Sequence, residues 1–219
     1  MTIDELEQAF SDLVSSFPLV SAEEIPDIDL YMDQVTTFME QKLSPCTRDP
    51  ENDKILTKTM INNYAKSSLL IPPVKKKYGT DHMLLLLFIF YKKSFLSISD
   101  IEAVLGPVRD RYVETPSAGK KPAKGQEEKK KSDITLKEIY SQVAEDITAS
   151  LPEISEDVKK AFADTRKTFA DKDPEDREVL QEFALLCRFS AEIYIKKLYI
   201  ERLLDEEKKA KEEGRKNND

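Results

Sequence analysis

The residues with the clearest potential for chemistry are six lysines between positions 54 and 80, a stretch that contains no aspartate or glutamate. They are Lys54, Lys58, Lys66, Lys75, Lys76 and Lys77. The chain as a whole has a formal net charge of -8, so this is a basic segment in an acidic protein. Such a segment is the usual electrostatic footprint of a surface that binds a polyanion. A solvated surface is the alternative, so the interpretation depends on the elements that carry these lysines.

Residues suited to catalysis are scarce. The single histidine, His82, lies in a strongly apolar helical stretch and cannot supply a two-histidine zinc site. No phosphate-binding glycine-rich motif is present, and the paired carboxylates among 42 acidic residues carry no positional signal. Cys46 and Cys187 do not form a disulfide framework. We therefore expect no enzyme activity, no catalytic residues, no metal and no cofactor.

The composition predicts an all-α fold. Tight β-turns use glycine heavily, but the chain has only five glycines, whereas 35% of its residues are charged and helix formers dominate. The longest apolar run, Met83 to Tyr91, is far shorter than the roughly 20 residues of a membrane helix. The first residues also lack the basic start and apolar stretch of a signal peptide. We expect a cytoplasmic protein that has no membrane partner.

Apolar spacing and capping residues indicate five helices in the first half of the chain. Thr2, Thr57 and Ser97 are expected as N-caps, Asp29 as the cap of the second helix, and Gly106-Pro107 as the end of the fifth. Residues 74–78 should be extended, because Pro72-Pro73 cannot continue a helix. The helices are expected at about 2–17, 30–42, 57–66, 82–93 and 97–106.

The second half reads as purely helical after a lysine-containing segment, residues 114–133, that is predicted to be a flexible linker. Pro152 is expected to close one helix, and a second follows to about Phe169. A long amphipathic helix then begins at Pro174, too long for two short helices to cover. Part of its apolar stripe should therefore meet a second copy of the chain, or else the helix folds back on its own domain. The predicted divisions are 1–29, 30–113, 114–133 and 134–219.

The order of elements over residues 30–106 resembles the winged helix-turn-helix domain of MerR-like transcription regulators. The resemblance rests on Ile61-Asn62-Asn63-Tyr64-Ala65-Lys66-Ser67-Ser68-Leu69-Leu70-Ile71-Pro72, on the basic turn Lys75-Lys76-Lys77-Tyr78, and on Ser94-Phe95-Leu96-Ser97-Ile98-Ser99-Asp100-Ile101. The run from Thr57 to Tyr64 with the Pro-Pro-Val-Lys-Lys-Lys-Tyr segment also looks like a bacterial family known only as a domain of unknown function, whose members are taken to be regulators. Two residues depart from the MerR-like pattern: Asn62 replaces an arginine and Ser68 replaces the turn glycine.

This resemblance implies a winged helix-turn-helix domain with a small β wing and a C-terminal helical domain. A recognition helix fits the major groove, where base edges are distinguishable. Asn62 and Asn63 are the candidates for reading bases, while Lys58 and Lys66 are the candidates for phosphate. Tyr78 is expected to anchor the wing to the core. The full set of candidate DNA-binding residues is Thr57, Lys58, Asn62, Asn63, Lys66, Lys75, Lys76 and Lys77.

The sequence therefore predicts a sequence-specific regulator of transcription that binds double-stranded DNA. It should be a homodimer through its C-terminal helices, and a small-molecule effector could occupy a pocket there. The alternative is a helical protein–protein interaction adaptor whose DNA-binding domain is vestigial. The acidic net charge, the missing arginine at Asn62 and the long amphipathic helix favour that alternative.

Overall fold

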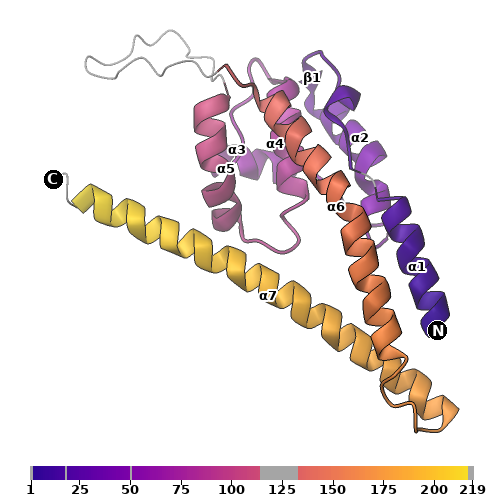
Figure 1. The fold of residues 1–219 in the computed structure, drawn as a ribbon. Helices are drawn as coiled ribbons and strands as arrows, with labels where there is room; N and C mark the ends of the chain where they lie inside the picture. Colours follow the sequence, from indigo (N-terminus) through magenta and orange to yellow (C-terminus); the bar gives the residue numbers. More distant parts are fainter. Residues whose placement is uncertain (1, 18, 50, 114–132, 217–219) are drawn as a thin grey trace. The chain divides into compact units, whose positions relative to one another are not determined.

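The computed structural model describes residues 2–17, 19–49, 51–113 and 133–216, and it is mostly helical with one small two-stranded sheet (Figure 1). The all-α prediction is confirmed. Two compact units divide the chain. One unit comprises Met1–Phe17 with Glu145–Asp219, and the other comprises Pro18–Ala144. These units differ from the predicted divisions, because the first helix groups with the C-terminal helices. Apart from Asp133, the predicted linker lies outside the described residues.

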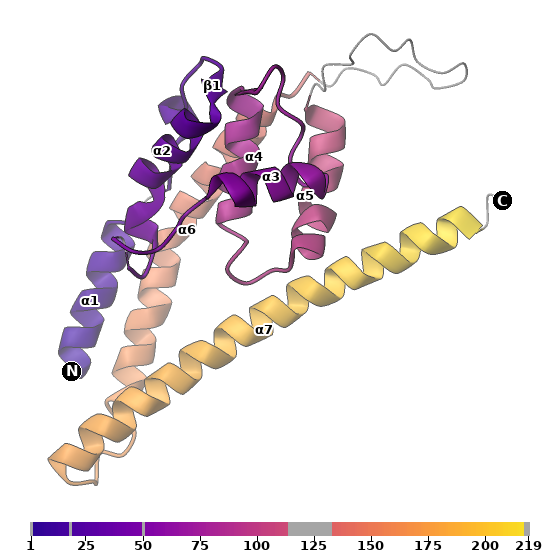
Figure 2. The ribbon, with the colours of Figure 1, turned by 180° about the vertical axis from the view of Figure 1, so that it is seen from behind.

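The unit formed by 18–144 is built around α4 (Thr80–Phe90), in which every residue from His82 to Phe90 is buried. Figure 2 shows α3 (Lys58–Lys66) running crosswise to α4 between α2 (Met32–Leu43) and α5 (Ile98–Tyr112). The start of α6 (Leu136–Thr165) joins this unit: Tyr140 is buried, its ring lies 5.1 Å from that of Phe88, and its hydroxyl donates to the Val20 carbonyl at 2.6 Å. An all-round apolar helix is thus the centre of the unit, as its sequence predicts.

The small sheet pairs β1 (Leu30–Tyr31) with β2 (Lys77–Tyr78) in antiparallel register, Leu30 opposite Tyr78 and Tyr31 opposite Lys77. The helix predicted at about 30–42 is present, but it begins at Met32, and Asp29 is not its cap. Tyr31 is the N-cap, with extended backbone angles of φ -79 and ψ 158. Pairing with a strand more than 40 residues away makes these two residues extended, and local periodicity carries no record of such a partner.

Two prolines that were expected to end helices lie inside them. Pro107 lies within α5, which continues to Tyr112, and Pro152 lies within α6, a single helix of 30 residues. A proline inside a helix costs roughly 3 kcal/mol and one hydrogen bond. In α6 the helix is held on both sides of the proline, by the buried Leu136 and Tyr140 before it and by Ala161 and Phe162 after it. Packing at both ends outweighs the local preference to stop.

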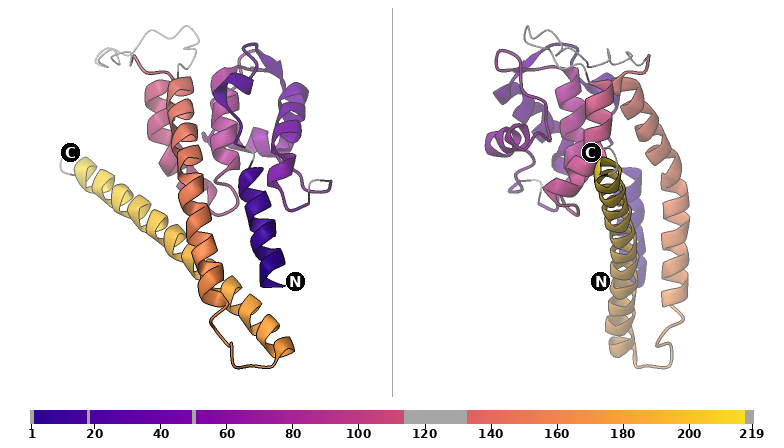
Figure 3. Two further views of the ribbon diagram at one scale, coloured as in Figure 1. Left: turned by 45° about the vertical axis from the view of Figure 1, so that its right-hand side comes forward. Right: turned by 90° about the vertical axis from the view of Figure 1, so that its left-hand side faces the viewer.

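The other unit contains α1 (Ile3–Ser15), the last part of α6 and α7 (Pro174–Lys216) (Figure 3). Its core consists of Ile3, Ala161, Phe162 and Leu185, with Leu6, Phe10, Val158 and Phe189 packed against them. The predicted capping box at Thr2 and Glu5 is present. The guanidinium of Arg166 pairs with Asp4 at 2.5 Å and Glu7 at 2.6 Å, which ties the end of α6 to α1. Among the described residues, no helix has the length and apolar character needed to cross a membrane.

Candidate nucleic-acid interface

Helix α3 presents a polar face outward. Thr57 is its N-cap, and its hydroxyl accepts a hydrogen bond from the Met60 amide at 3.2 Å. Ile61 and Tyr64 are 0% and 5% exposed and face the core. The side chains expected outside, Lys58, Asn62, Asn63 and Lys66, are all exposed, while Thr57 is half-buried. The three-residue spacing of these two buried positions places both on one face of the helix and so orients it.

The C-terminal end of α3 turns sharply at Ser68, whose φ of 62 lies in the left-handed region. This is the position at which the MerR-like pattern has glycine, so a serine here adopts the conformation that glycine reaches without strain. The Tyr64 carbonyl accepts hydrogen bonds from the Leu70 amide at 3.0 Å and from the Ser67 hydroxyl at 3.2 Å. The corner therefore keeps the glycine-type backbone although its residue is serine.

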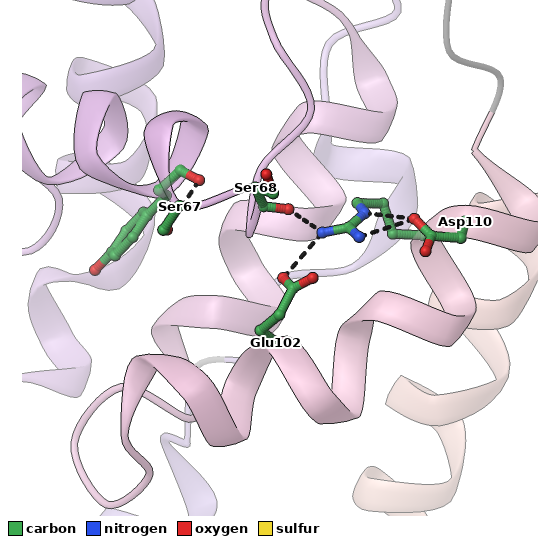
Figure 4. Close-up of polar contacts among 6 residues, drawn as sticks. Ser67, Ser68, Glu102 and Asp110 are labelled. Atoms are coloured by element: carbon green, nitrogen blue, oxygen red, sulfur yellow. Dashed lines mark hydrogen bonds and ion pairs between the residues drawn. The ribbon is translucent and has the colours of Figure 1, made fainter. Parts of the chain in front are cut away.

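Arg109, in the last turn of α5, holds that corner in place. Its guanidinium donates to the Ser68 carbonyl, to Glu102 Oε2 at 2.9 Å and to Asp110 Oδ1 at 2.8 Å (Figure 4). The side chain is only 12% exposed. This contact depends on the additional turn of helix after Pro107, which carries Arg109. The sequence did not predict the contact because α5 was expected to end at Gly106-Pro107. The end of α3 is thus fixed by a charged donor from another helix.

The predicted wing is a tight hairpin turn. Lys77 donates its amide to the Val74 carbonyl at 2.9 Å, and Val74 donates to the Lys77 carbonyl at 3.1 Å. Lys75 and Lys76, between them, have φ values of 51 and 65. Reciprocal hydrogen bonds around two residues of positive φ are the features of a type I′ turn, which favours Asn-Gly. Both lysines are exposed at the tip, whereas Lys77 is half-buried.

Tyr78 and His82 connect this hairpin to α4. Tyr78 is 3% exposed, and its ring meets that of His82 edge-on at 5.3 Å. His82 Nδ1 accepts a hydrogen bond from the amide of Gly79, the N-cap of α4, at 3.1 Å. Burial lowers the pKa of the His82 imidazole, although the nearby Asp29 carboxylate opposes that shift. Tyr78 thus anchors the hairpin to the core as expected, and His82 packs against it and caps the start of α4.

Two residues of the surface were not anticipated. Asp33, on α2, forms an ion pair with Lys58, so the basic surface is not free of acidic side chains. Tyr31 falls within the helix predicted at about 30–42, but it lies on β1 and is 55% exposed, and the Lys77 ammonium lies 5.4 Å from the centre of its ring. Both contacts are tertiary, between segments far apart in sequence. Only knowledge of the strand pairing and of the packing of α2 on α3 could have revealed them.

The remaining acidic residues near the N-terminal end of this unit are partly engaged elsewhere. Glu24 pairs with Lys42 at 2.5 Å, and Glu23 lies 3.9 Å from Lys137. Asp29 lies beside Gly79, and its Oδ1 is 3.1 Å from the position that a Cβ would take if Gly79 were a larger residue.

In Figure 2, α3 and the chain that leads from it to α4 lie on the side of the unit that faces the viewer. Between them these segments carry exposed lysine ammonium groups, two exposed asparagine amides and the N-terminus of α3, all groups that can donate to phosphate or to base edges.

Comparison with known proteins gives one family match. Residues 20–143 match a family described as a domain of unknown function, DUF1836. No curated protein and no solved structure matches the chain. The matched residues coincide closely with the unit formed by Pro18–Ala144, and they include α3 and the hairpin. The match covers more than half of the chain, and the protein therefore belongs to the DUF1836 family.

Proposed function

We propose that the protein is a sequence-specific regulator of transcription whose 18–144 unit is a winged helix-turn-helix domain of the MerR-like kind. In this proposal α3 enters the major groove of double-stranded DNA, and the Val74–Lys77 hairpin is the wing that contacts the backbone. An α-helix fits the major groove, and a wing beside it contacts phosphates. The outward row of α3 and the lysines at the hairpin tip support this arrangement.

One observation carries the proposal: the hairpin tip has two lysines where its backbone favours Asn-Gly. A residue with a Cβ in the left-handed conformation costs about 1 kcal/mol relative to glycine. Lys75 and Lys76 are both exposed there, and neither belongs to the buried core of the unit. Lysine at both positions therefore lowers the stability of the fold, and no packing contact of these side chains in the core offsets the loss. Two ammonium groups projected from a rigid turn are what contact with the DNA backbone needs.

The α3 side chains divide by chemistry. Asn62 and Asn63 can donate and accept in one plane, which matches the edge of adenine in the major groove. Lys66 and Lys58 can neutralise phosphates, but Lys58 first has to exchange its ion pair with Asp33 for one with DNA. Ion pairs between exposed side chains are weak, so this exchange costs little. The net charge of -8 opposes indiscriminate binding to DNA and leaves affinity to specific contacts.

The test is selection from a random duplex library with the full chain. We expect the wild type to enrich a defined motif, and the Lys75→Ala/Lys76→Ala variant to lose most of that enrichment. The matched control is Lys159→Ala/Lys160→Ala, which removes two adjacent exposed lysines from α6 and should enrich the same motif as the wild type. A library that yields no motif with folded wild-type protein contradicts the proposal.

The adaptor alternative is favoured by a different observation, the exposed apolar side chains of α7. Phe183 and Tyr194 are 64% and 63% exposed. Exposed apolar side chains of this kind often mark a surface that another protein covers. An adaptor with a vestigial DNA-binding domain should yield no motif in the selection. It should instead retain a stoichiometric protein partner, and α7 substitutions at these two residues should abolish that retention.

A further inference from the structure

Helix α7 carries a row of exposed apolar side chains that no contact within its own unit explains. Val179, Phe183, Leu186 and Ile193 are 64%, 64%, 54% and 65% exposed. Ser190, which is also exposed, lies in the same row between Leu186 and Ile193. The successive separations are four, three, four and three residues. This alternation is the heptad spacing of the seam of a two-stranded coiled coil.

The row lies on a different face of α7 from the one that packs in the unit's core. Leu185 is buried and Phe189 packs against the same core. Gln181, one turn earlier, is 7% exposed and donates to the carbonyls of Arg166 at 3.1 Å and Thr168 at 2.9 Å. These three positions are four residues apart and define the inward face. The exposed row is therefore a second apolar face, free while the first is occupied.

The charges along α7 determine which way a second helix can lie on that face. Residues 174–186 contain four acidic residues and one basic residue, whereas residues 187–204 contain four basic residues and two acidic ones. A parallel partner would place like-charged halves side by side. It would also place Lys197, the next position of the row after Ile193, opposite the same lysine. An antiparallel partner places each acidic half against a basic half and avoids the lysine pair.

We propose that α7 pairs with α7 of a second copy of the chain in antiparallel orientation, with the two-fold axis between Ser190 and Ile193. About this axis Phe183 lies beside the half-buried Ile200 of the partner subunit, and Leu186 lies beside the methylene chain of the partner's Lys197. The Lys197 ammonium already pairs with Glu201 of its own helix, which leaves that chain available to cover Leu186. An isologous two-fold contact of this kind is the commonest form of homodimer.

The exposed area is sufficient for a stable pair. The four apolar side chains and the flanking Tyr194 leave on the order of 500 Å² uncovered on each protomer, so a pair buries about 1,000 Å² in total, the lower limit of a specific interface. Ser190 at the seam weakens the pair relative to an all-apolar one. The proposal concerns the C-terminal helices only and does not depend on DNA binding.

The first test is the mass of the full chain by sedimentation equilibrium. We expect a dimer for the wild type and a monomer for Phe183→Gln/Ile193→Gln, whose circular dichroism should match that of the wild type because both residues are exposed. The matched control, Ile195→Gln/Tyr199→Gln, removes two equally exposed apolar side chains from a different face and should remain a dimer. A wild type that is monomeric at concentrations up to about 100 μM, or a control as dissociated as the seam variant, overturns the proposal.

The second test measures a distance that distinguishes antiparallel from parallel pairing of the two α7 helices. A spin label at Glu178→Cys, in a chain that also carries Cys46→Ser and Cys187→Ser, lies about 13 residues from the proposed axis. At 1.5 Å per residue, the two labels of an antiparallel dimer are roughly 40 Å apart, whereas those of a parallel in-register dimer are within about 20 Å. Electron–electron double resonance separates these values. The short distance overturns the antiparallel arrangement.

Discussion

Exchanging Lys75 and Lys76 for Asn and Gly should have opposite effects on folding and on DNA binding. Both residues have positive φ, at 51 and 65, in a turn whose backbone favours Asn-Gly. Glycine at position 76 relieves up to about 1 kcal/mol of strain, and asparagine at position 75, which keeps a Cβ but tolerates the left-handed region, relieves a smaller amount; the extra freedom of glycine in the unfolded chain takes back roughly 0.5–1 kcal/mol. The expected net gain is about 0.5 kcal/mol, which corresponds to a rise in Tm of roughly 1–2 °C for a protein of this size.

The same exchange removes two charges from the proposed contact with phosphate. Each phosphate contact contributes about -0.9 to the log–log dependence of affinity on salt, so the slope should become less steep by about 2 per subunit. Thermal melts and fluorescence anisotropy with the selected duplex measure the two effects on one preparation. The control, Lys75→Ala/Lys76→Ala, loses the same charges but retains a Cβ at both positions, so its affinity should fall equally without a gain in Tm. Equal Tm values for the two variants would refute the strain, and undiminished affinity in either would refute the contact.

Three further predictions concern single residues. Arg109→Met should lower the free energy of unfolding by about 2 kcal/mol, since it removes charged hydrogen bonds to the Ser68 carbonyl and to Glu102, and urea denaturation would contradict this if the midpoint did not move. Asp33→Asn should raise affinity for the selected duplex severalfold by releasing Lys58, and an anisotropy titration that matches the wild type counts against a role for Lys58. His82→Gln should remove a loss of stability on acidification: burial lowers the His82 pKa below 6.5, so as pH falls through that value the unfolded chain takes up a proton that the folded one resists. Because His82 is the only histidine, thermal melts between pH 7.5 and 5 isolate this effect from the carboxylates that titrate lower, and parallel pH profiles for the two proteins would contradict it.

The parts of the fold that follow from local signals were predictable from the sequence. Thr2, Thr57 and Ser97 cap helices as expected, because a hydroxyl before an apolar periodic run satisfies a free backbone amide. The parts that depend on distant partners were not. Leu30 and Tyr31 form a strand through pairing with Lys77 and Tyr78, which lie more than 40 residues later. Helices continue through prolines for the same reason, that packing outweighs a local preference.

The candidate site divides in the same way. The outward orientation of Asn62, Asn63 and Lys66 follows from the spacing of two buried residues in α3, so the sequence was sufficient for it. Neither the ion pair between Asp33 and Lys58 nor the hydrogen bond from Arg109 to the Ser68 carbonyl could be predicted. Each contact joins segments whose relative packing is set by the whole unit. The family match adds that the residues from 20 to 143 form one recurring domain, without indicating what that domain binds.

The most direct test of the central claim is the salt dependence of duplex binding by the wild type and by a variant in which Lys58, Lys66, Lys75 and Lys76 are all alanine. If α3 and the hairpin bind DNA as proposed, the wild type should show a log–log slope of about -4 per subunit, from four phosphate contacts, and the variant a slope near zero. A wild type that does not bind duplex DNA at low salt, or a variant that keeps the wild-type slope, would contradict the account.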